Sequence, residues 1–385
     1  MDGTTKTMMN LIGCEVCGTE WNPAFYAALS EEEKTELYRL SKKHDLAHLV
    51  GNALVNHKLL DEGKLKEAYQ KETFLAVYRC ERLAYELKEL RRAFNEAQIP
   101  FIPLKGSVIR AYYPEPWMRT SCDIDILVKE SDADAAADYL AKKLSYRFEV
   151  KGQHDISLFA PSGIHIELHF KLMDLDFQQV PMLNDVWTGG EIAIASGCEY
   201  RMSNELFLLY HIYHMAKHFI HGGCGIKPFI DLWIIKNRIG YQDEKAESLL
   251  RESNLLLFYN RATELGNVWF EENAHNAVTR EMENYVLSGG VYGSLEQYLA
   301  MTQNRKGGAF GFLLSKLFLS YEQMKIYYPS LKKCPLLFPF YQVRRWFRIL
   351  FCGGRKSALD QIRVNQTLSD EKKRSSKNLM DELGL

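Results

Sequence analysis

Apolar residues recur at intervals of three and four along the first part of the chain. They begin after Ser30 and Glu33, whose spacing is that of a capping box, in which each side chain caps the other residue's backbone N–H. The same period continues as far as Phe94, with arginines and glutamates between the apolar positions. We therefore predict a helical region over residues 1–95, with its charged positions facing water.

The pattern becomes strand-like between residues 96 and 190. Five short runs of alternating or continuous apolar residues predict strands, and two further segments predict helices, the second with Ser131 as its N-cap. The predicted strands are IPFIPLKG, DIDILV, YRFEVKG, DISLFAP and IHIELHF, and the predicted helices are SVIRAYY and SDADAAADYLAKKL. This order of elements indicates a compact α+β (α/β core) unit between helical flanks.

Helical patterns return after residue 190. Ser203 is a predicted N-cap for the segment NELFLLYHIYHMAKHFI, and further helical segments follow it. Together they predict a helical domain over residues 191–300.

The last part of the chain differs in charge. Between Arg305 and Lys356, eleven lysines or arginines are interleaved with aromatic residues and accompanied by a single acidic residue. We predict a basic, aromatic-rich helical region over residues 301–365, which is a candidate to bind RNA, an anionic membrane surface or no ligand at all. Residues 366–385 have the composition of a loosely ordered polar tail.

Composition narrows the class of protein. With 46% hydrophobic and 25% charged residues and a net charge of −1, the chain has the makeup of a folded globular protein rather than of a disordered or polyanion-coating one. No apolar run approaches the length of a membrane span, and the N-terminus lacks the apolar stretch of a signal peptide. We therefore expect a cytoplasmic protein without a transmembrane segment.

Two aspartates stand inside an otherwise apolar predicted strand. In DIDILV, the alternation of a strand places Asp123 and Asp125 on one face and the isoleucines on the other. In the later strand IHIELHF, the same alternation presents Glu167. Carboxylates gathered on one sheet face repel one another unless a cation lies between them, and oxygen ligands of this kind suit Mg²⁺. We predict that these three residues hold two Mg²⁺ ions, or Mn²⁺ in their place.

A second group of residues upstream suits the phosphates of a nucleotide. Gly106 and Ser107 stand where a strand gives way to a short helix, and a glycine there allows the backbone to approach a ligand closely. Lys105 and Arg119 add positive charge on either side of this turn. We predict that these four residues bind the triphosphate of a nucleotide substrate. The alternative for Lys105 and Arg119 is an ordinary surface or loop charge.

The combined pattern LKG…YYP…R…DIDILV…H…IELHF resembles the DNA polymerase β nucleotidyltransferase superfamily. More narrowly, it is similar to a bacterial family described only as uncharacterised nucleotidyltransferases, from about residue 30 to about residue 350. The resemblance implies a core with a small mixed sheet, flanked by helical regions. It also implies that Asp123, Asp125 and Glu167 are the metal-binding and catalytic carboxylates, and that Gly106 and Ser107 hold the triphosphate.

Members of that superfamily transfer a nucleoside monophosphate from an NTP such as ATP to a hydroxyl or phosphate group and release pyrophosphate. The resemblance therefore implies a Mg²⁺-dependent transferase with an NTP as substrate. It leaves open whether the acceptor is a small molecule, a sugar, a protein or RNA. The competing hypothesis is a non-catalytic regulatory or RNA- or partner-binding protein that retains the fold, although nucleic acid is not the favoured partner. A nuclease-type phosphodiesterase is a third hypothesis.

Histidines in and after the predicted core are further candidates. His169 shares the predicted strand face of Glu167 and could hydrogen-bond a metal-binding carboxylate. Lys217 and His218 lie on the helix that follows the core and are candidates for contact with the substrate. The alternative for these residues is ordinary packing.

Two residue pairs have spacings that occur in zinc sites. They are Cys14 with Cys17, and His214 with His218. The sequence shows neither a second cysteine pair of this kind nor the glutamate of an H-E-x-x-H motif. A zinc site is therefore not favoured at either place.

Overall fold

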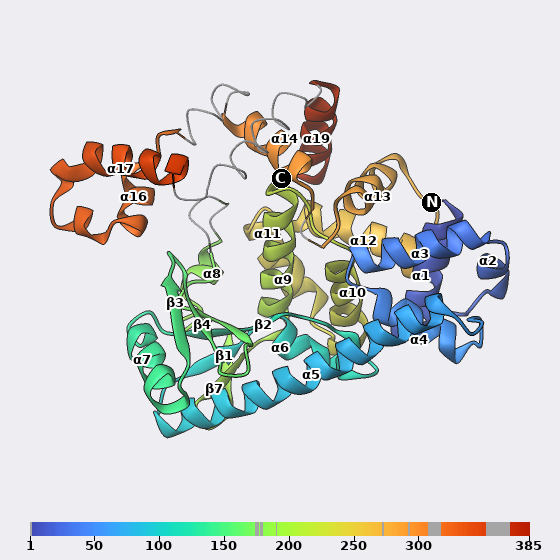
Figure 1. Ribbon diagram of the computed structural model, residues 1–385, viewed down its shortest axis with the longest axis horizontal. Coiled ribbons are helices and arrows are strands. Elements are labelled where there is room, and N and C mark those ends of the chain that lie inside the picture. Colours follow the sequence, from blue (N-terminus) through green and yellow to red (C-terminus); the bar gives the residue numbers. More distant parts are fainter. Residues whose placement is uncertain are drawn as a thin grey trace. The chain divides into compact units, whose positions relative to one another are not determined.

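Figure 1 shows the computed structural model of the chain. It describes residues 2–173, 177, 180–189, 191–271, 273–291, 293–306, 317–351 and 370–385. The chain divides into two compact units. The first comprises residues 1–215 and 226–280, and the second comprises residues 216–225 and 281–385.

Helices precede the sheet in the first unit. They are α1 (Gly3–Ile12), α2 (Pro23–Ala27), α3 (Glu31–Lys43), α4 (Ala47–Asn56) and α5 (Lys64–Glu96). The capping box at the start of α3 is confirmed. The N–H of Glu33 donates to Ser30 Oγ at 3.3 Å, and the N–H of Ser30 donates to the Glu33 carboxylate at 2.8 Å.

Within the described residues, seven strands form one mixed sheet in the order β3-β4-β5-β2-β1-β7-β6. They are β1 (Phe101–Pro103), β2 (Asp123–Val128), β3 (Arg147–Lys151), β4 (Asp155–Phe159), β5 (His165–His169), β6 (Ile192–Ser196) and β7 (Glu199–Met202). The pairs β2–β5 and β1–β7 are parallel, and the other neighbours are antiparallel. The five predicted strands are confirmed.

Strands β6 and β7 extend the sheet into the segment for which the pattern predicts helices. They pair as an antiparallel hairpin beside β1. Most of β6 is exposed and two of its residues are alanines, so it lacks the apolar alternation by which a half-buried strand is recognised in a sequence. With these strands included, the fold is α+β with a mixed sheet, as predicted.

One face of the sheet is apolar and packs against helices. Ile124 and Ile126 of β2 share a core cluster with Ile166 and Leu168 of β5. Helix α5 and helix α7 (Ala133–Leu144) add their leucines and alanines to this cluster and cover the apolar face (Figure 1). Full burial of an isoleucine side chain contributes about 1.5–3 kcal/mol, so this packing sets the register of β2 against β5. Because strand side chains alternate, the acidic residues of both strands lie on the opposite face.

The two predicted N-caps have different outcomes. Ser203 is confirmed, since its Oγ accepts a hydrogen bond from the N–H of Leu206 at 3.1 Å. The prediction that Ser131 is the N-cap of α7 is wrong, because Asp132 occupies that position. The hydroxyl of Ser131 donates to the neighbouring Asp132 carboxylate at 3.0 Å. A prediction based on residue type alone does not consider this local hydrogen bond.

Helices complete both units. They are α6 (Gly106–Ile109), α8 (Pro181–Asn184), α9 (Asn204–Ile220), α10 (Lys227–Ile234), α11 (Asp243–Glu252), α12 (Leu256–Phe270), α13 (Ala277–Gly289), α14 (Leu295–Lys306), α16 (Tyr321–Tyr327), α17 (Phe338–Phe351) and α19 (Asp370–Leu383). No helix in the described ranges combines the length and the apolar character needed to cross a membrane.

The C-terminal segment departs from its prediction. Parts of the predicted basic region and polar tail, residues 307–316 and 352–369, lie outside the described residues. The expectation of a loosely ordered end is wrong for α19, which buries Leu379, Met380 and Leu383. Their spacing of one and three residues places them on one side of a helix, which a composition-based argument overlooks.

Candidate metal and nucleotide site

Asp123, Asp125 and Glu167 meet on the polar face of the sheet. In the parallel register of β2 and β5, Asp125 lies opposite Glu167, and Asp123 lies opposite His165. Ligand atoms of Asp123, His165 and Glu167 all lie within 4.8 Å of one another. A second group, made of Asp125, Glu167 and His169, meets the same limit. The structure thus brings together the three predicted carboxylates and adds two histidines to them.

The Asp125 carboxylate is held by two basic neighbours. Its Oδ1 accepts hydrogen bonds from Lys105 Nζ at 2.9 Å and from His169 Nε2 at 2.8 Å. Burial by itself would raise the pKa of Asp125, but the Lys105 ammonium and the His169 ring hold that pKa well below its usual range. The same contacts raise the pKa of Lys105 and of His169 against the effect of their own burial. Asp125 is therefore ionised although its side chain is buried.

Asp123 has a different electrostatic environment. Burial raises its pKa, and the negative charges of Asp125 and Glu167 raise it further, with Lys105 opposing them. The acidic face, as we call Asp123, Asp125 and Glu167 together, thus holds more negative charge than its lysine and histidine neighbours balance. Such an excess favours the binding of a cation.

Lys105 reaches Asp125 from a strained backbone position. Its φ of 43° and ψ of −121° lie in a region that favours glycine. Strain of this kind costs about 1–3 kcal/mol and persists where the surrounding structure imposes it, often at functional sites. The N–H of Leu104 donates to the Asp125 carbonyl at 3.0 Å, which ties the turn to β2. The Lys105–Ser107 turn is therefore built onto the strand that carries the aspartates.

Gly106 lies next to an arginine that the sequence analysis missed. Arg110 donates from Nε to the Gly106 carbonyl at 2.8 Å and from Nη2 to Ser121 Oγ at 2.8 Å. Its remaining nitrogen, Nη1, is buried and has no hydrogen-bond partner within the described residues. A Cβ at position 106 would lie 3.4 Å from Ser121 Oγ and 3.5 Å from Arg110 Nη2, which is ordinary van der Waals contact. The spacing of four residues between Gly106 and Arg110 is the signal that could have identified it.

Arg119 forms a buried ion pair with Asp231 of α10. Its Nε and Nη2 donate to the Asp231 carboxylate at 2.7–2.9 Å, and its Nη1 donates to the Thr120 carbonyl at 2.5 Å. Tyr113 donates to the same carboxylate at 2.7 Å. Burial would lower the pKa of Arg119, but Asp231 raises it, and Arg119 holds the pKa of Asp231 below its usual range. Each nitrogen of this guanidinium is thus engaged within the protein.

A second, partly buried ion pair involves the same helix. Lys227, the first residue of α10, donates from Nζ to Asp45 Oδ2 at 2.6 Å and to Thr120 Oγ1 at 2.8 Å. We call Arg119–Asp231 and Lys227–Asp45 the anchoring pairs. They attach the loop before β2 to α10 and to the connection between α3 and α4.

The other candidates lie elsewhere in the chain. Lys217 and His218 belong to the part of α9 that is assigned to the second unit, and their contact with substrate stays a prediction. Within the described ranges, neither the Cys14–Cys17 pair nor the His214–His218 pair belongs to a group of three metal ligands.

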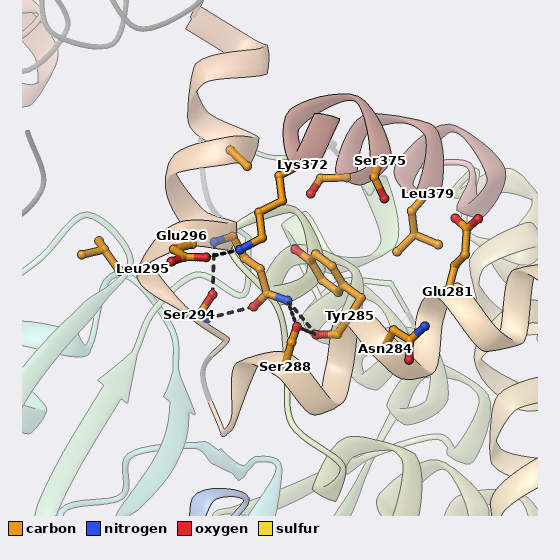
Figure 2. Close-up of a pocket in the computed structure, with 13 residues that line it drawn as sticks. Glu281, Asn284, Tyr285, Ser288, Ser294, Leu295, Glu296, Lys372, Ser375 and Leu379 are labelled. Atoms are coloured by element: carbon orange, nitrogen blue, oxygen red, sulfur yellow. Dashed lines mark hydrogen bonds and ion pairs between the residues drawn. The ribbon is translucent and has the colours of Figure 1, made fainter. Parts of the chain in front are cut away.

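The second unit contains a cavity of about 760 Å³, lined by residues of α13, α14 and α19 (Figure 2). Among its lining residues, Lys372 forms an ion pair with Glu296, and Gln297 Nε2 donates to the Tyr285 carbonyl at 2.6 Å. None of the predicted site residues lines this cavity. The three predicted carboxylates lie instead in the first unit, on the polar face of the sheet.

Comparison with known proteins identifies the family of the chain. A family model described as "Uncharacterised nucleotidyltransferase" matches residues 30–271, a range that includes every predicted site residue. No match is found among curated proteins or among solved structures.

Proposed function

We propose that this chain, which belongs to the uncharacterised nucleotidyltransferase family, transfers a nucleoside monophosphate from an NTP to a hydroxyl or phosphate acceptor. The observation that carries the proposal is the convergence of three carboxylates from neighbouring parallel strands beside a Lys-Gly-Ser turn. A polymerase β-like nucleotidyltransferase core has these parts.

The donor set fits divalent metal ions. Asp123, Asp125 and Glu167 present carboxylate oxygens from two adjacent strands, and hard ions such as Mg²⁺ or Mn²⁺ prefer such oxygens. Two bound ions would neutralise the charge of the triphosphate and favour the ionised form of an attacking hydroxyl. Asp123 and Asp125 would hold both ions, and Glu167 would complete the site.

The Lys105–Ser107 turn, at the start of α6, would receive the β- and γ-phosphates. The N–H of Ser107 is already used, since it donates to the Leu104 carbonyl at 3.0 Å. The Ser107 hydroxyl and the N–H of Gly106 are therefore the groups that would meet phosphate oxygens. Lys105 would add its charge, and its ion pair with Asp125 couples this turn to the carboxylates.

The reaction would proceed as an in-line displacement. The acceptor oxygen bonds to the α-phosphorus, the bond from that phosphorus to the bridging oxygen breaks, and pyrophosphate leaves with the bonding electrons. Glu167 would take the proton of the acceptor hydroxyl. Its side chain is partly exposed, so an acceptor can approach it from solvent.

The proposal is tested with Asp123→Asn and Asp125→Asn variants of the full chain. We expect both to lose Mg²⁺-dependent binding of NTP and transfer of label from α-³²P-labelled NTPs to acceptors in a cell extract. Asp138→Asn is the matched control, because Asp138 is an exposed aspartate on α7 that forms an ion pair with Lys142 on the same helix. Unchanged binding and label transfer in the two site variants would contradict the proposal. Retention of the protein on RNA without label transfer would favour the non-catalytic alternative.

A further inference from the structure

We infer that His165 binds one of the catalytic metal ions directly through Nδ1, so that this ion has a mixed nitrogen and oxygen ligand set that favours Mn²⁺ over Mg²⁺. The inference rests on the proposed function, which assigns metal ions to the acidic face. It adds an imidazole nitrogen to the three carboxylate ligands.

The position of His165 follows from strand register. His165 lies on β5 opposite Asp123 of β2, two residues before Glu167 on the same side of the strand. Its Nδ1 is 3.8 Å from Glu167 Oε1, which is within the spacing of two ligands that share one ion. One face of the sheet therefore offers an imidazole nitrogen and two carboxylates around a common point.

Hydrogen bonds fix which ring nitrogen of His165 carries the proton. Its Nε2 lies 2.6 Å from Ser157 Oγ, and the same Oγ lies 2.8 Å from Glu149 Oε2. A carboxylate only accepts, and a serine hydroxyl has one hydrogen to donate. Ser157 must therefore donate to Glu149 and accept from the Nε2–H of His165. In the neutral ring the lone pair is then on Nδ1, the nitrogen that lies 3.8 Å from Glu167 Oε1.

A local irregularity of the sheet supplies Glu149. Strand β3 pairs Phe148 with Leu158 and then Val150 with Ser157, so Glu149 is an extra residue at a β-bulge. Bulges re-aim side chains and are frequent next to active sites. Ser157 itself is buried and lies opposite Glu167 in the β4–β5 pairing. The relay from Glu149 through Ser157 to His165 is thus held by three neighbouring strands.

This relay matches the way proteins prepare a histidine for metal binding. A metal-binding imidazole usually donates its second N–H to an oxygen that is itself hydrogen-bonded, which orients the ring and fixes its tautomer. A lone pair on Nδ1 beside the Glu167 carboxylate would be repulsive by itself, and a divalent ion held by His165, Asp123 and Glu167 would remove that repulsion. The arrangement is therefore stable as a set of ligands.

His169 provides the contrast on the same strand. Its Nε2 lies 2.8 Å from Asp125 Oδ1 and 3.3 Å from Glu167 Oε2, so this nitrogen donates toward carboxylates instead of offering them a lone pair. His169 is accordingly a positioning residue for the acidic face, whereas His165 is a ligand. Imidazole is a poor ligand for Mg²⁺ and a better one for Mn²⁺ and later transition metals, which gives the preference for Mn²⁺.

The experiment loads the full chain with Mn²⁺ alone and records pulsed EPR spectra. We expect modulation from one directly bound ¹⁴N in the wild type and none in His165→Gln. His154→Gln is the matched control, because this histidine stacks on His169 at 5.9 Å but belongs to neither ligand group. The control should keep the ¹⁴N signal.

Two further variants separate a ligand from a structural role. His165→Asp should bind Mn²⁺ without ¹⁴N modulation and with a Mn²⁺/Mg²⁺ affinity ratio reduced by about 10-fold, since an oxygen replaces the nitrogen. Ser157→Ala should keep the ¹⁴N signal but weaken Mn²⁺ binding by about 10-fold, because the ring loses its orienting partner.

The outcomes also distinguish this inference from the proposed function. Mn²⁺ that binds without ¹⁴N modulation, or with modulation that persists in His165→Gln, overturns the role of His165 and leaves the nucleotidyl transfer proposal standing. A wild-type chain that binds no Mn²⁺ overturns both.

Discussion

The first unit contains two groups of charges, each partly buried, that differ in how they are balanced. In the anchoring pairs, each carboxylate faces a cation: Asp231 faces Arg119, and Asp45 faces Lys227. On the acidic face, three carboxylates share Lys105 and the ring of His169. The anchoring pairs are therefore complete without a ligand, whereas the acidic face retains negative charge for a cation. The two groups therefore differ more in charge balance than in burial. The balanced anchoring pairs support the loop before β2, and the unbalanced acidic face is suited to bind metal.

Breaking an anchoring pair should have the largest effect. Arg119→Met leaves the Asp231 carboxylate buried without its cation, and loss of one partner of a buried pair costs about 3–5 kcal/mol. We expect the free energy of unfolding, measured by urea denaturation, to fall by about this amount. Arg92→Met is the control: its side chain is 59% exposed, so we expect a change within about 0.5 kcal/mol. A small change in stability together with a large loss of NTP affinity would instead favour the phosphate-binding role predicted for Arg119.

The loop held by the anchoring pairs should also give the protein a pH-dependent stability. His48 Nε2 donates to the Met118 carbonyl at 2.9 Å, and burial lowers the pKa of His48 to about 4. Between this pKa and that of an unfolded histidine near 6.5, the unfolded chain binds a proton that the folded chain does not. The contribution is therefore complete above pH about 6.5 and is lost as the pH falls toward 4, by about 3 kcal/mol.

The measurement compares urea unfolding of the wild type and His48→Gln at several pH values. We expect the wild type to lose more stability than the variant between pH 6.5 and pH 4. Parallel pH profiles of the two proteins would show that His48 does not remain neutral in the folded state.

Loss of a charge from the acidic face should raise the free energy of unfolding, whereas loss of a charge from an anchoring pair should lower it. The raised pKa of Asp123 means that the folded chain binds a proton more readily than the unfolded one, so ionised Asp123 lowers stability at neutral pH. Without divalent ions, Asp123→Asn should therefore raise the free energy of unfolding by about 1 kcal/mol.

Addition of Mn²⁺ at a hundredfold excess over its Kd should reverse this order. The wild type should gain about 2.7 kcal/mol, and Asp123→Asn should gain little because a ligand is missing. Thermal unfolding with and without the ion measures both effects. A variant that is less stable than the wild type without metal would show that Asp123 has a structural partner.

The candidate site was predictable to the extent that it depends on alternation along a strand. The pattern DIDILV places Asp123 and Asp125 on one face, and IHIELHF does the same for His165, Glu167 and His169. The helical lead-in and the capping box at Ser30 were predictable for a similar reason, because both depend on residues within one or two turns of each other.

Contacts between distant segments were not predictable in this way. Arg119 looks like a phosphate ligand until Asp231, 112 residues later, is seen to accept its hydrogen bonds. Ser157 and Glu149 carry no motif of their own. Glu149 faces Ser157 because β3 has a bulge, and a single sequence does not reveal where a bulge occurs.

The sequence by itself determined which side chains share a face of each strand and each helix, because backbone geometry alone sets periods of 2.0 and 3.6 residues. The tertiary structure decided which faces meet. The strand order places β5 between β2 and β4, which brings Glu167 against Asp125 on one side and His165 within reach of Ser157 on the other. The tertiary structure also places Asp231 of α10 against Arg119. These pairings depend on how the apolar faces of many elements pack together. The sequence of a single segment does not determine that packing.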